Sequence, residues 1–356
     1  MADNTNTRIP TSFDVARKAG VSRSTVSRVF TGGARVSPEV RARVFDAADA
    51  LGYRVNALAR GLQARHSNLV GVVASRLDTP FRALQVRCLA QKLLLEGMNP
   101  LLLVADGGED IRALIHNILS YSVSGVIVTS DTPSPDVVQA CNEAGVPVVM
   151  INRGPASTGA DTVRMDLDAG GRAAFEMLSE CGTPRFGLLA PAQKTYSVTG
   201  RASAFKTCCA DAGQPVVHIA SDGQGHDAGK AAASALFAEV TAGRIDSLFC
   251  ATDLLALGVL DGLRHDRGVD IPGTLQIVGF DDIEQAAWSA YGLSTIRQDI
   301  VEQAVTAVEL VLLRLEDPWR PFETRTFGLQ KVLRGTTRGR SAPGPALPVP
   351  RDDAPA

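Results

Sequence analysis

The sequence lacks the features of membrane-spanning and secreted proteins. No apolar run reaches the roughly 18 residues that a membrane-spanning helix needs. The first ten residues, MADNTNTRIP, contain no apolar segment typical of a secretion signal, so we expect a cytoplasmic protein. None of the six cysteines forms a CxxC pair, and most have apolar neighbours. We therefore expect reduced, buried thiols, and a redox role for the adjacent Cys208 and Cys209 stays open.

Motifs of common enzyme classes are also missing. The five histidines show no metal-ligand spacing, and neither a GxSxG turn nor a GxxxxGK[ST] phosphate loop occurs. Residues 223–228, GQGHDA, loosely match a dinucleotide-binding fingerprint. That match follows the sixth predicted strand rather than the first, and no acid clearly ends a strand about 20 residues later. We therefore expect no metal, no cofactor and no catalytic residues.

The charge of the chain is unevenly distributed. The 356 residues suffice for two or three domains, and their formal net charge is –2. Residues 1–66 contain 11 lysines and arginines against 5 acidic residues, whereas the remaining 290 residues contain 25 against 33. A basic head followed by an acidic body indicates that one end of the chain contacts phosphate groups.

Residues 11–52 predict three short helices with recognisable ends. The second helix, residues 23–29, places Val26 and Val29 at the i, i+3 spacing of an inward face. The third helix begins with Ser37 and Pro38, a cap followed by proline at the first helical position. The other predicted caps and stops are Thr11 with Asp14, Gly20, Ser22 and Gly52.

Two short helices joined by a glycine turn and supported by a third form a helix-turn-helix unit, whose second helix enters the major groove. We predict base contacts by Arg23, Ser24 and Arg28, because arginine can donate two hydrogen bonds to guanine. Predicted phosphate contacts are Thr11, Ser22, Thr25, Ser27, Tyr53 and Asn56. A generic three-helix interaction domain is the alternative.

From Leu69 onward, short apolar runs alternate with helical stretches. Strands are predicted at 69–73, 101–104, 125–128 and 146–151, then at 186–189, 216–219, 247–250 and 276–280. Helices are predicted over 82–95, 109–121 and 135–143, then near 170–180, 199–212, 227–242 and 253–265. The repeat predicts an α/β body of two doubly wound parallel-sheet lobes, with a ligand cleft at the carboxyl ends of the strands.

The head closely resembles, without gaps over some fifty residues, the head of the LacI family of bacterial transcription regulators. The resemblance is carried by Phe13-Asp14-Val15-Ala16, Ala19-Gly20-Val21-Ser22, Thr25-Val26-Ser27-Arg28-Val29, Val36-Ser37, Leu51-Gly52-Tyr53, Asn56, Leu58-Ala59 and Leu62. It implies a hinge helix after Tyr53 that orders on DNA, with Ala59 and Leu62 in the minor groove. Leu58 and Leu62 lie four residues apart in a segment too short for a stable isolated helix, which agrees with this role. Packing of Leu62 on the body is the alternative.

The body resembles the periplasmic-binding-protein-like body of the same family up to about residue 337. The matching residues are Thr79-Pro80-Phe81, Arg201, Thr252-Asp253, Val278-Gly279-Phe280-Asp281-Asp282 and Ser294-Thr295-Ile296-Arg297-Gln298-Asp299. The resemblance implies that Arg201 and Asp281 bind polar ligand groups from opposite walls and that Phe81 stacks on the ligand. A helix cap at Asp281 and a surface ion pair at Arg201 are the alternatives.

Three positions depart from or add to that pattern. Arg82 stands where relatives usually carry an aromatic residue, Thr252 stands where many carry Asn, and Arg153 follows the fourth predicted strand. With Arg201, the two further arginines lead to the hypothesis of an anionic effector, such as a sugar acid or a sugar phosphate. The predicted effector site comprises Phe81, Arg82, Arg153, Arg201, Thr252 and Asp281.

These predictions give a flexible N-terminus (1–10), an all-α helix-turn-helix head (11–55), a hinge (56–66), a two-lobed body (67–337) and a disordered tail (338–356). Lobe 1 is expected to comprise about 67–165 and 297–327, and lobe 2 about 166–296 and 328–337. The expected function is that of a homodimeric regulator, by resemblance a repressor, on a pseudopalindromic operator under effector control. A sugar-binding transport protein or an α/β enzyme is disfavoured by the basic head and the missing phosphate loop.

Overall fold

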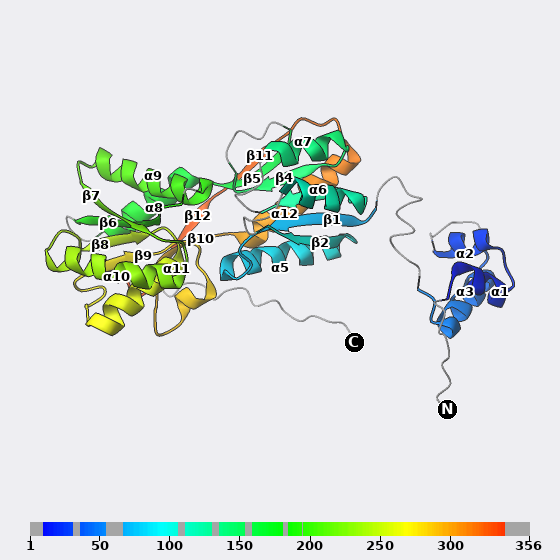
Figure 1. Ribbon diagram of the computed structural model, residues 1–356, viewed down its shortest axis with the longest axis horizontal. Helices are drawn as coiled ribbons and strands as arrows, with labels where there is room; N and C mark the ends of the chain where they lie inside the picture. Colours follow the sequence, from blue (N-terminus) through cyan, green and yellow to red (C-terminus); the bar gives the residue numbers. More distant parts are fainter. Residues whose placement is uncertain are drawn as a thin grey trace, which may run out of the picture. The chain divides into compact units, whose positions relative to one another are not determined.

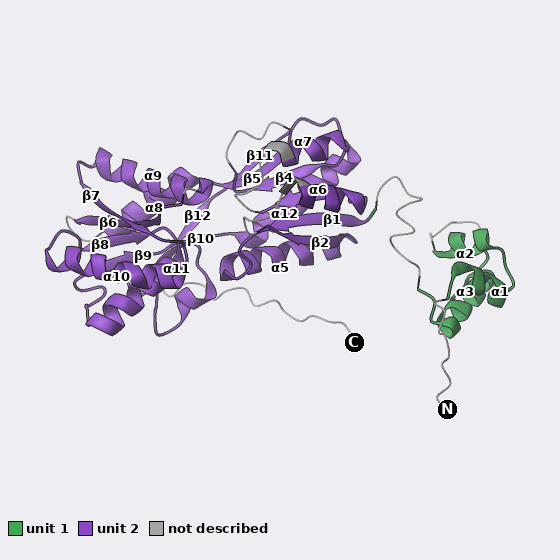
Figure 2. Ribbon diagram, viewed as in Figure 1, with its two compact units in different colours: residues 1–67 green, residues 68–356 purple. Residues whose placement is uncertain are grey.

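The computed structural model describes residues 10–30, 36–54, 67–105, 111–129, 135–153, 159–180, 184–193 and 195–338. The chain divides into two compact units, Met1–Ser67 and Asn68–Ala356 (Figure 2). None of the helices in these described stretches is long and apolar enough to cross a membrane.

The first unit, the head, contains three helices, α1 (Ser12–Ala19), α2 (Arg23–Phe30) and α3 (Pro38–Leu51). The Asp14 carboxylate accepts hydrogen bonds from the Thr11 N–H (2.9 Å) and the Thr11 hydroxyl (2.7 Å), which fixes the start of α1. Gly20, at φ 65°, ends that helix in the left-handed conformation. The apolar faces of the helices meet in one core of Val15, Ala16, Ala19, Val26, Val29, Val44, Ala47 and Ala48.

Within the second unit, lobe 1 contains a six-stranded parallel sheet in the order β11-β5-β4-β3-β1-β2 (Figure 1). Its central strands are short apolar runs with helices on both faces, which is why they are buried on both sides. The strands are β1 (Leu69–Ala74), β2 (Asn99–Val104), β3 (Gly125–Val128), β4 (Val148–Ile151), β5 (Asp161–Met165) and β11 (Thr324–Phe327). The helices are α5 (Pro80–Leu95), α6 (Ile111–Ser120), α7 (Pro135–Glu143) and α12 (Ile300–Glu316).

Lobe 2 repeats this plan with a four-stranded parallel sheet in the order β7-β6-β8-β9. Its strands are β6 (Phe186–Pro191), β7 (Val216–Ser221), β8 (Ser247–Cys250) and β9 (Gln276–Val278). Its helices are α8 (Leu167–Ser179), α9 (Tyr196–Asp211), α10 (His226–Thr241) and α11 (Asp253–Leu260). The helix predicted over 253–265 changes character, because a π-helical turn follows α11 at Asp261–His265. Gly258 lets α10 and α11 pack closely, since a Cβ there would lie 2.0 Å from the His226 carbonyl oxygen.

The chain crosses between the lobes through β10 (Thr295–Gln298) and β12 (Leu329–Val332), which pair antiparallel (Figure 1). Between these two strands the chain adds α12 and β11 to lobe 1, so lobe 1 is closed by a segment distant in sequence. The sequence patterns did not predict β5, β10, β11 or β12.

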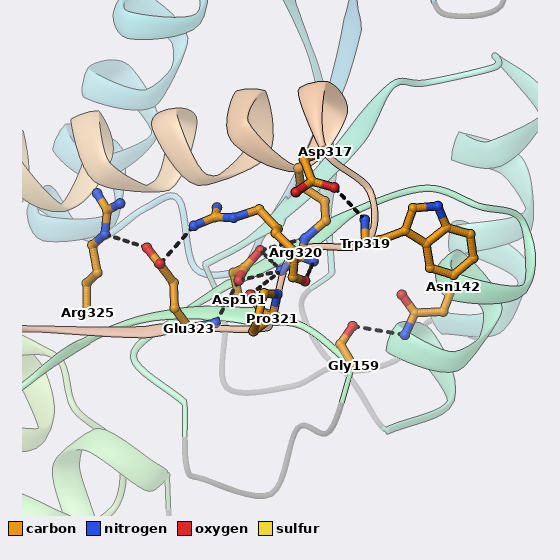
Figure 3. Close-up of polar contacts among 10 residues, drawn as sticks. Asn142, Gly159, Asp161, Asp317, Trp319, Arg320, Pro321, Glu323 and Arg325 are labelled. Carbon is orange, nitrogen blue, oxygen red and sulfur yellow. Dashed lines mark hydrogen bonds and ion pairs between the residues drawn. The ribbon is translucent and has the colours of Figure 1, made fainter.

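A buried ion pair holds that added segment in place. Arg314 of α12 donates to both carboxylate oxygens of Asp161 at 2.9 Å, and both side chains are almost fully buried. The Glu323 N–H also donates to Asp161 (2.9 Å), and Glu323 pairs with Arg320 and Arg325 (Figure 3). The start of β5 is thereby attached to the segment that leads into β11.

Candidate functional site

The head presents one polar face of α2 to solvent. Val26 and Val29 are buried, as predicted, whereas Arg23, Ser24 and Arg28 are exposed. Arg28 donates to the Ser24 hydroxyl at 3.5 Å, one helical turn away. These side chains therefore lie where a groove-binding helix needs its base-contacting groups.

The described residues predicted to contact phosphate are exposed or half-buried in the head. Ser22 is exposed and accepts the Thr25 N–H at 3.2 Å, so it caps α2 as predicted. Thr11 and Ser27 are exposed, and Tyr53 is half-buried with its ring 5.9 Å from that of Phe30. Asn56, Ala59 and Leu62 lie outside the described residues, and their predicted contacts remain predictions.

The body contains a cavity of about 650 Å³, its open mouth included, between the carboxyl ends of the two parallel sheets. Short loops after the strands supply most of its polar lining, as expected for doubly wound folds. The lining residues are Arg76, Thr79, Phe81, Arg82, Thr129, Asn152, Met165, Ser197, Val198, Arg201, Gln224, Thr252, Leu254, Asp281, Ile283 and Gln298.

Arg201 and Asp281 are joined directly rather than facing each other across the cavity. Arg201 Nη1 lies 3.1 Å from Asp281 Oδ1, with the side chains 5% and 11% exposed. The expectation of opposite walls is wrong, because both residues belong to lobe 2 and the ring of Phe280 positions the guanidinium 4.1 Å above it. A surface ion pair is equally wrong, since this pair is buried in the cavity wall.

The backbone at Asp281 is held in an uncommon conformation. Asp281 has φ 120° and Asp282 has φ 53°, values that side-chain-bearing residues rarely adopt. Asp282 is fixed by Arg297 (2.5 Å) and Arg334 (2.7 Å), which are on or next to the crossing strands. The turn aims the Asp281 carboxylate at Arg201 and Gln298 instead of capping the short helix that follows, so the capping alternative is also wrong.

Burial dominates the electrostatics of the Asp281 carboxyl. It raises the pKa of Asp281 above the usual range, although Arg201, the Gln298 amide and Arg82 favour the charged form. Ligand hydroxyl groups that donate to Asp281 and accept from Arg201 would replace hydration that the buried pair has lost. The pair is therefore suited to binding neighbouring hydroxyl groups.

On the lobe 1 side, Arg82 is buried at the first turn of α5. Its Nη1 donates to Gln85 Oε1 (2.5 Å) and to the Thr129 carbonyl. Phe81 lines the cavity beside it and packs against the apolar core of lobe 2. Thr252 lines the opposite side, where its hydroxyl caps α11 by accepting from Leu255 N–H at 3.2 Å.

Arg153 is not among the described residues that line the cavity, whereas its neighbour Asn152 is. Asn152 has φ 56°, and its Oδ1 accepts from the Met165 N–H at 3.1 Å. Sequence reasoning missed Arg76, Gln224 and Gln298. Arg76 could have been found by the rule that selected Arg153, because it comes two residues after the end of β1.

Among the described residues, no group of three or more His, Cys, Asp and Glu side chains could hold a metal ion. All five described cysteines are free thiols. Burial raises the pKa of Cys209 to about 12, while the neighbouring Cys208 is less buried.

Two family models match the chain, one over each unit. Residues 13–56 match the model of bacterial regulatory proteins of the lacI family, and residues 175–337 match that of the periplasmic binding protein-like domain. The chain is 28% identical over 305 residues to catabolite control protein A of Priestia megaterium, covering 85% of this chain and 91% of the relative.

Solved structures are similar over nearly the whole length. The complex of the transcriptional regulator CelR with cellobiose matches with a TM-score of 0.68 and 27% identity, covering 92% of this chain and 99% of that one. The lac repressor dimer bound to operator and the anti-inducer ONPF has a TM-score of 0.82 at 24% identity, covering 93% and 99%. The second likeness supports the fold: a helical head followed by an α/β body with parallel sheets.

Proposed function

The chain belongs to the LacI family of bacterial DNA-binding transcription regulators, and from this premise we propose a separate function for each of its two units. The polar face of α2 reads base edges in the major groove through Arg23, Ser24 and Arg28. The cavity of the body binds a small effector that changes the affinity for DNA. The observation that carries this proposal is α2 itself, with its valines buried and its arginines exposed.

We expect the protein to act in the cytoplasm as a homodimeric repressor without catalytic activity. Two heads then contact the half-sites of a pseudopalindromic operator, and Leu62 of each copy opens the central base step. The lacI-family match ends at residue 56, so this part of the proposal rests on the sequence of the hinge.

The lining of the cavity favours a carbohydrate derivative with an acidic group. The Arg201–Asp281 pair suits neighbouring hydroxyl groups, and Phe81 offers an apolar face for a sugar ring. Arg76 and Arg82 also line the cavity, and Asp281 is the one carboxylate among its described lining residues.

Selection from random duplex DNA tests the DNA-binding part. We expect enrichment of a two-fold symmetric sequence and a steep loss of affinity between about 50 and 200 mM salt, because phosphate contacts release counterions. A purified, folded chain that binds every duplex equally, or that ignores salt, would contradict the assignment of the head.

Calorimetry with glucose, gluconate and glucose 6-phosphate tests the effector class. The acidic sugars should bind more tightly than glucose, and Arg82→Ala should remove their advantage, whereas Arg172→Ala on the exposed face of α8 should not. If glucose bound as tightly as its acidic derivatives and Arg82→Ala changed nothing, the anionic class would be wrong.

A further inference from the structure

A chain of buried side-chain hydrogen bonds runs from lobe 2 to lobe 1 behind the cavity. Both ends line the cavity, but the middle leaves it and passes through the protein interior. We call this chain the glutamine relay. In order, its members are Arg201, Asp281, Gln298, Gln303, Gln85 and Arg82.

The first half of the relay links α9 to the crossing strand β10. Asp281 Oδ1 accepts from Arg201 Nη1 at 3.1 Å and from Gln298 Nε2 at 2.7 Å. The other end of the Gln298 amide, Oε1, accepts from Gln303 Nε2 at 3.5 Å. One carboxylate oxygen therefore connects the cation of lobe 2 to an amide at the lobe boundary.

The second half links α12 to α5. Gln85 Nε2 donates to Gln303 Oε1 at 3.3 Å, and Arg82 Nη1 donates to Gln85 Oε1 at 2.5 Å. Each glutamine donates through its nitrogen and accepts through its oxygen, so the amides point in one direction along the relay. A shift at one end therefore changes the geometry available to the next group.

Glutamine is an energetically unfavourable residue in a buried helix–helix contact. Gln85 and Gln303 are 0% exposed, and the same contact between α5 and α12 buries Leu89, Ala304 and Ala307. A buried amide that loses its partners destabilises the fold, whereas apolar side chains of similar size would pack there without needing partners. Packing of lobe 1 therefore does not account for two amides at this place.

We propose that the glutamine relay couples the effector contacts of lobe 2 to α5 of lobe 1, with Gln85 and Gln303 as positioning residues that touch no effector. This inference rests on the proposed function. An effector that engages Arg201 and Asp281 alters the acceptor seen by Gln298, and the change reaches Arg82 through the two buried amides. Coupling is reciprocal, so DNA bound at the head alters the state of lobe 2 through the same residues.

Hydrogen exchange of the full chain, free and bound to the selected duplex, tests the relay without an effector. In the unmodified chain, duplex binding should change exchange of backbone amides in lobe 2 around residues 279–284 as well as in lobe 1. In Gln303→Met the lobe 2 change should fall at least about fivefold, the lower end of common allosteric couplings, while the lobe 1 change persists. Gln85→Met should behave in the same way.

The double variant separates a relay from two independent packing defects. A relay interrupted once is fully interrupted, so Gln85→Met/Gln303→Met should lose no more coupling than either single variant. Gln139→Met is the matched control, because Gln139 is exposed on α7 and donates to Glu143 of the same helix at 2.8 Å. Thermal unfolding of each variant verifies that the body is folded.

The inference is overturned if duplex binding leaves lobe 2 exchange unchanged in the unmodified chain, if the single variants keep its full change, or if their losses add in the double variant. Loss of coupling in the control would overturn it as well. A chain that selects no duplex would instead refute the proposed function, and the relay with it.

Discussion

The head displays its functional side chains to solvent, whereas the body holds its own in the interior. In the head, Arg28 contacts Ser24, four positions away, and a small apolar core supports the exposed face. In the body, Arg201 reaches Asp281, 80 positions away, and both are buried. The exposed DNA-binding face of the head thus depends on local helix ends and a small core. The buried cavity of the body depends on contacts between segments that are distant in sequence. Variants can test this division.

The largest effect should follow from a charge in the core of the head. Val15 is fully buried there, and an unpaired carboxylate costs several kcal/mol, which is close to the whole stability of a small domain, about 5 kcal/mol. Val15→Asp should abolish duplex binding and leave the thermal transition of the body unchanged. Ala42→Asp adds the same charge at an exposed position and should retain a folded head. Destabilisation of the body by Val15→Asp would contradict the separation between the core of the head and the contacts of the body.

A large effect confined to the body is expected from Arg314→Met. The change leaves the buried Asp161 carboxylate without its cation, which costs about 3–5 kcal/mol. Denaturant unfolding measures the loss, and a second change, Asp161→Leu, should restore much of it. A loss under about 1 kcal/mol, typical of a surface pair, would contradict the buried network of Figure 3.

A smaller effect, confined to DNA recognition, is expected from Arg28→Ala. Loss of a two-bond contact to guanine should reduce discrimination by about 1–3 kcal/mol, with no change in stability because Arg28 is exposed. Competition between selected and random duplexes measures this. Arg43→Ala, on the exposed face of α3, should weaken binding to both duplexes alike. Equal losses in the two variants would mean that α2 does not read bases.

A comparison of unfolding at different pH values tests the buried carboxyl of Asp253. Burial, reinforced by the negative charge of Asp281, raises the pKa of Asp253 to about 8, although hydrogen bonds from Thr295 and Ile283 oppose the shift. The folded chain then binds a proton that the unfolded chain releases above about pH 4, so this carboxyl's contribution to stability falls as pH rises from about 4 to about 8. Relative to Asp253→Asn, the unmodified chain should lose up to about 1.4 kcal/mol per pH unit in that window. Parallel pH profiles of the two proteins would contradict the raised pKa.

The difference between local contacts in the head and long-range contacts in the body also explains which features could be predicted from the sequence. The caps, the glycine stops and the inward valines of the head are local signals, and the structure confirms them. The alternation of apolar runs and helices also predicted the two parallel sheets of the body. Phe81, Arg82, Arg201, Thr252 and Asp281 do line one cavity, although their binding roles stay predictions.

The features that could not be predicted from the sequence depend on contacts between segments that are distant in the chain. The strand β12 has only four residues, of which Val332 alone is buried, and its partner β10 lies more than thirty positions earlier. The left-handed turn at Asn152 could not be foreseen either, so Arg153 was assigned to the cavity that Asn152 lines. The direct bond between Arg201 and Asp281 needs the strained turn at Asp281, which no local pattern reveals.

The closure of lobe 1 by α12 and β11 has a consequence for synthesis on the ribosome. All four strands of the lobe 2 sheet have been made once residue 278 has emerged, whereas lobe 1 waits for residues 300–327. The sheet of the lobe that begins first is thus completed after the sheet of lobe 2, with its β5 edge unpaired in the interval. A nascent chain halted before α12 would expose that edge and the apolar sheet face that α12 covers, which makes it a natural client for chaperones.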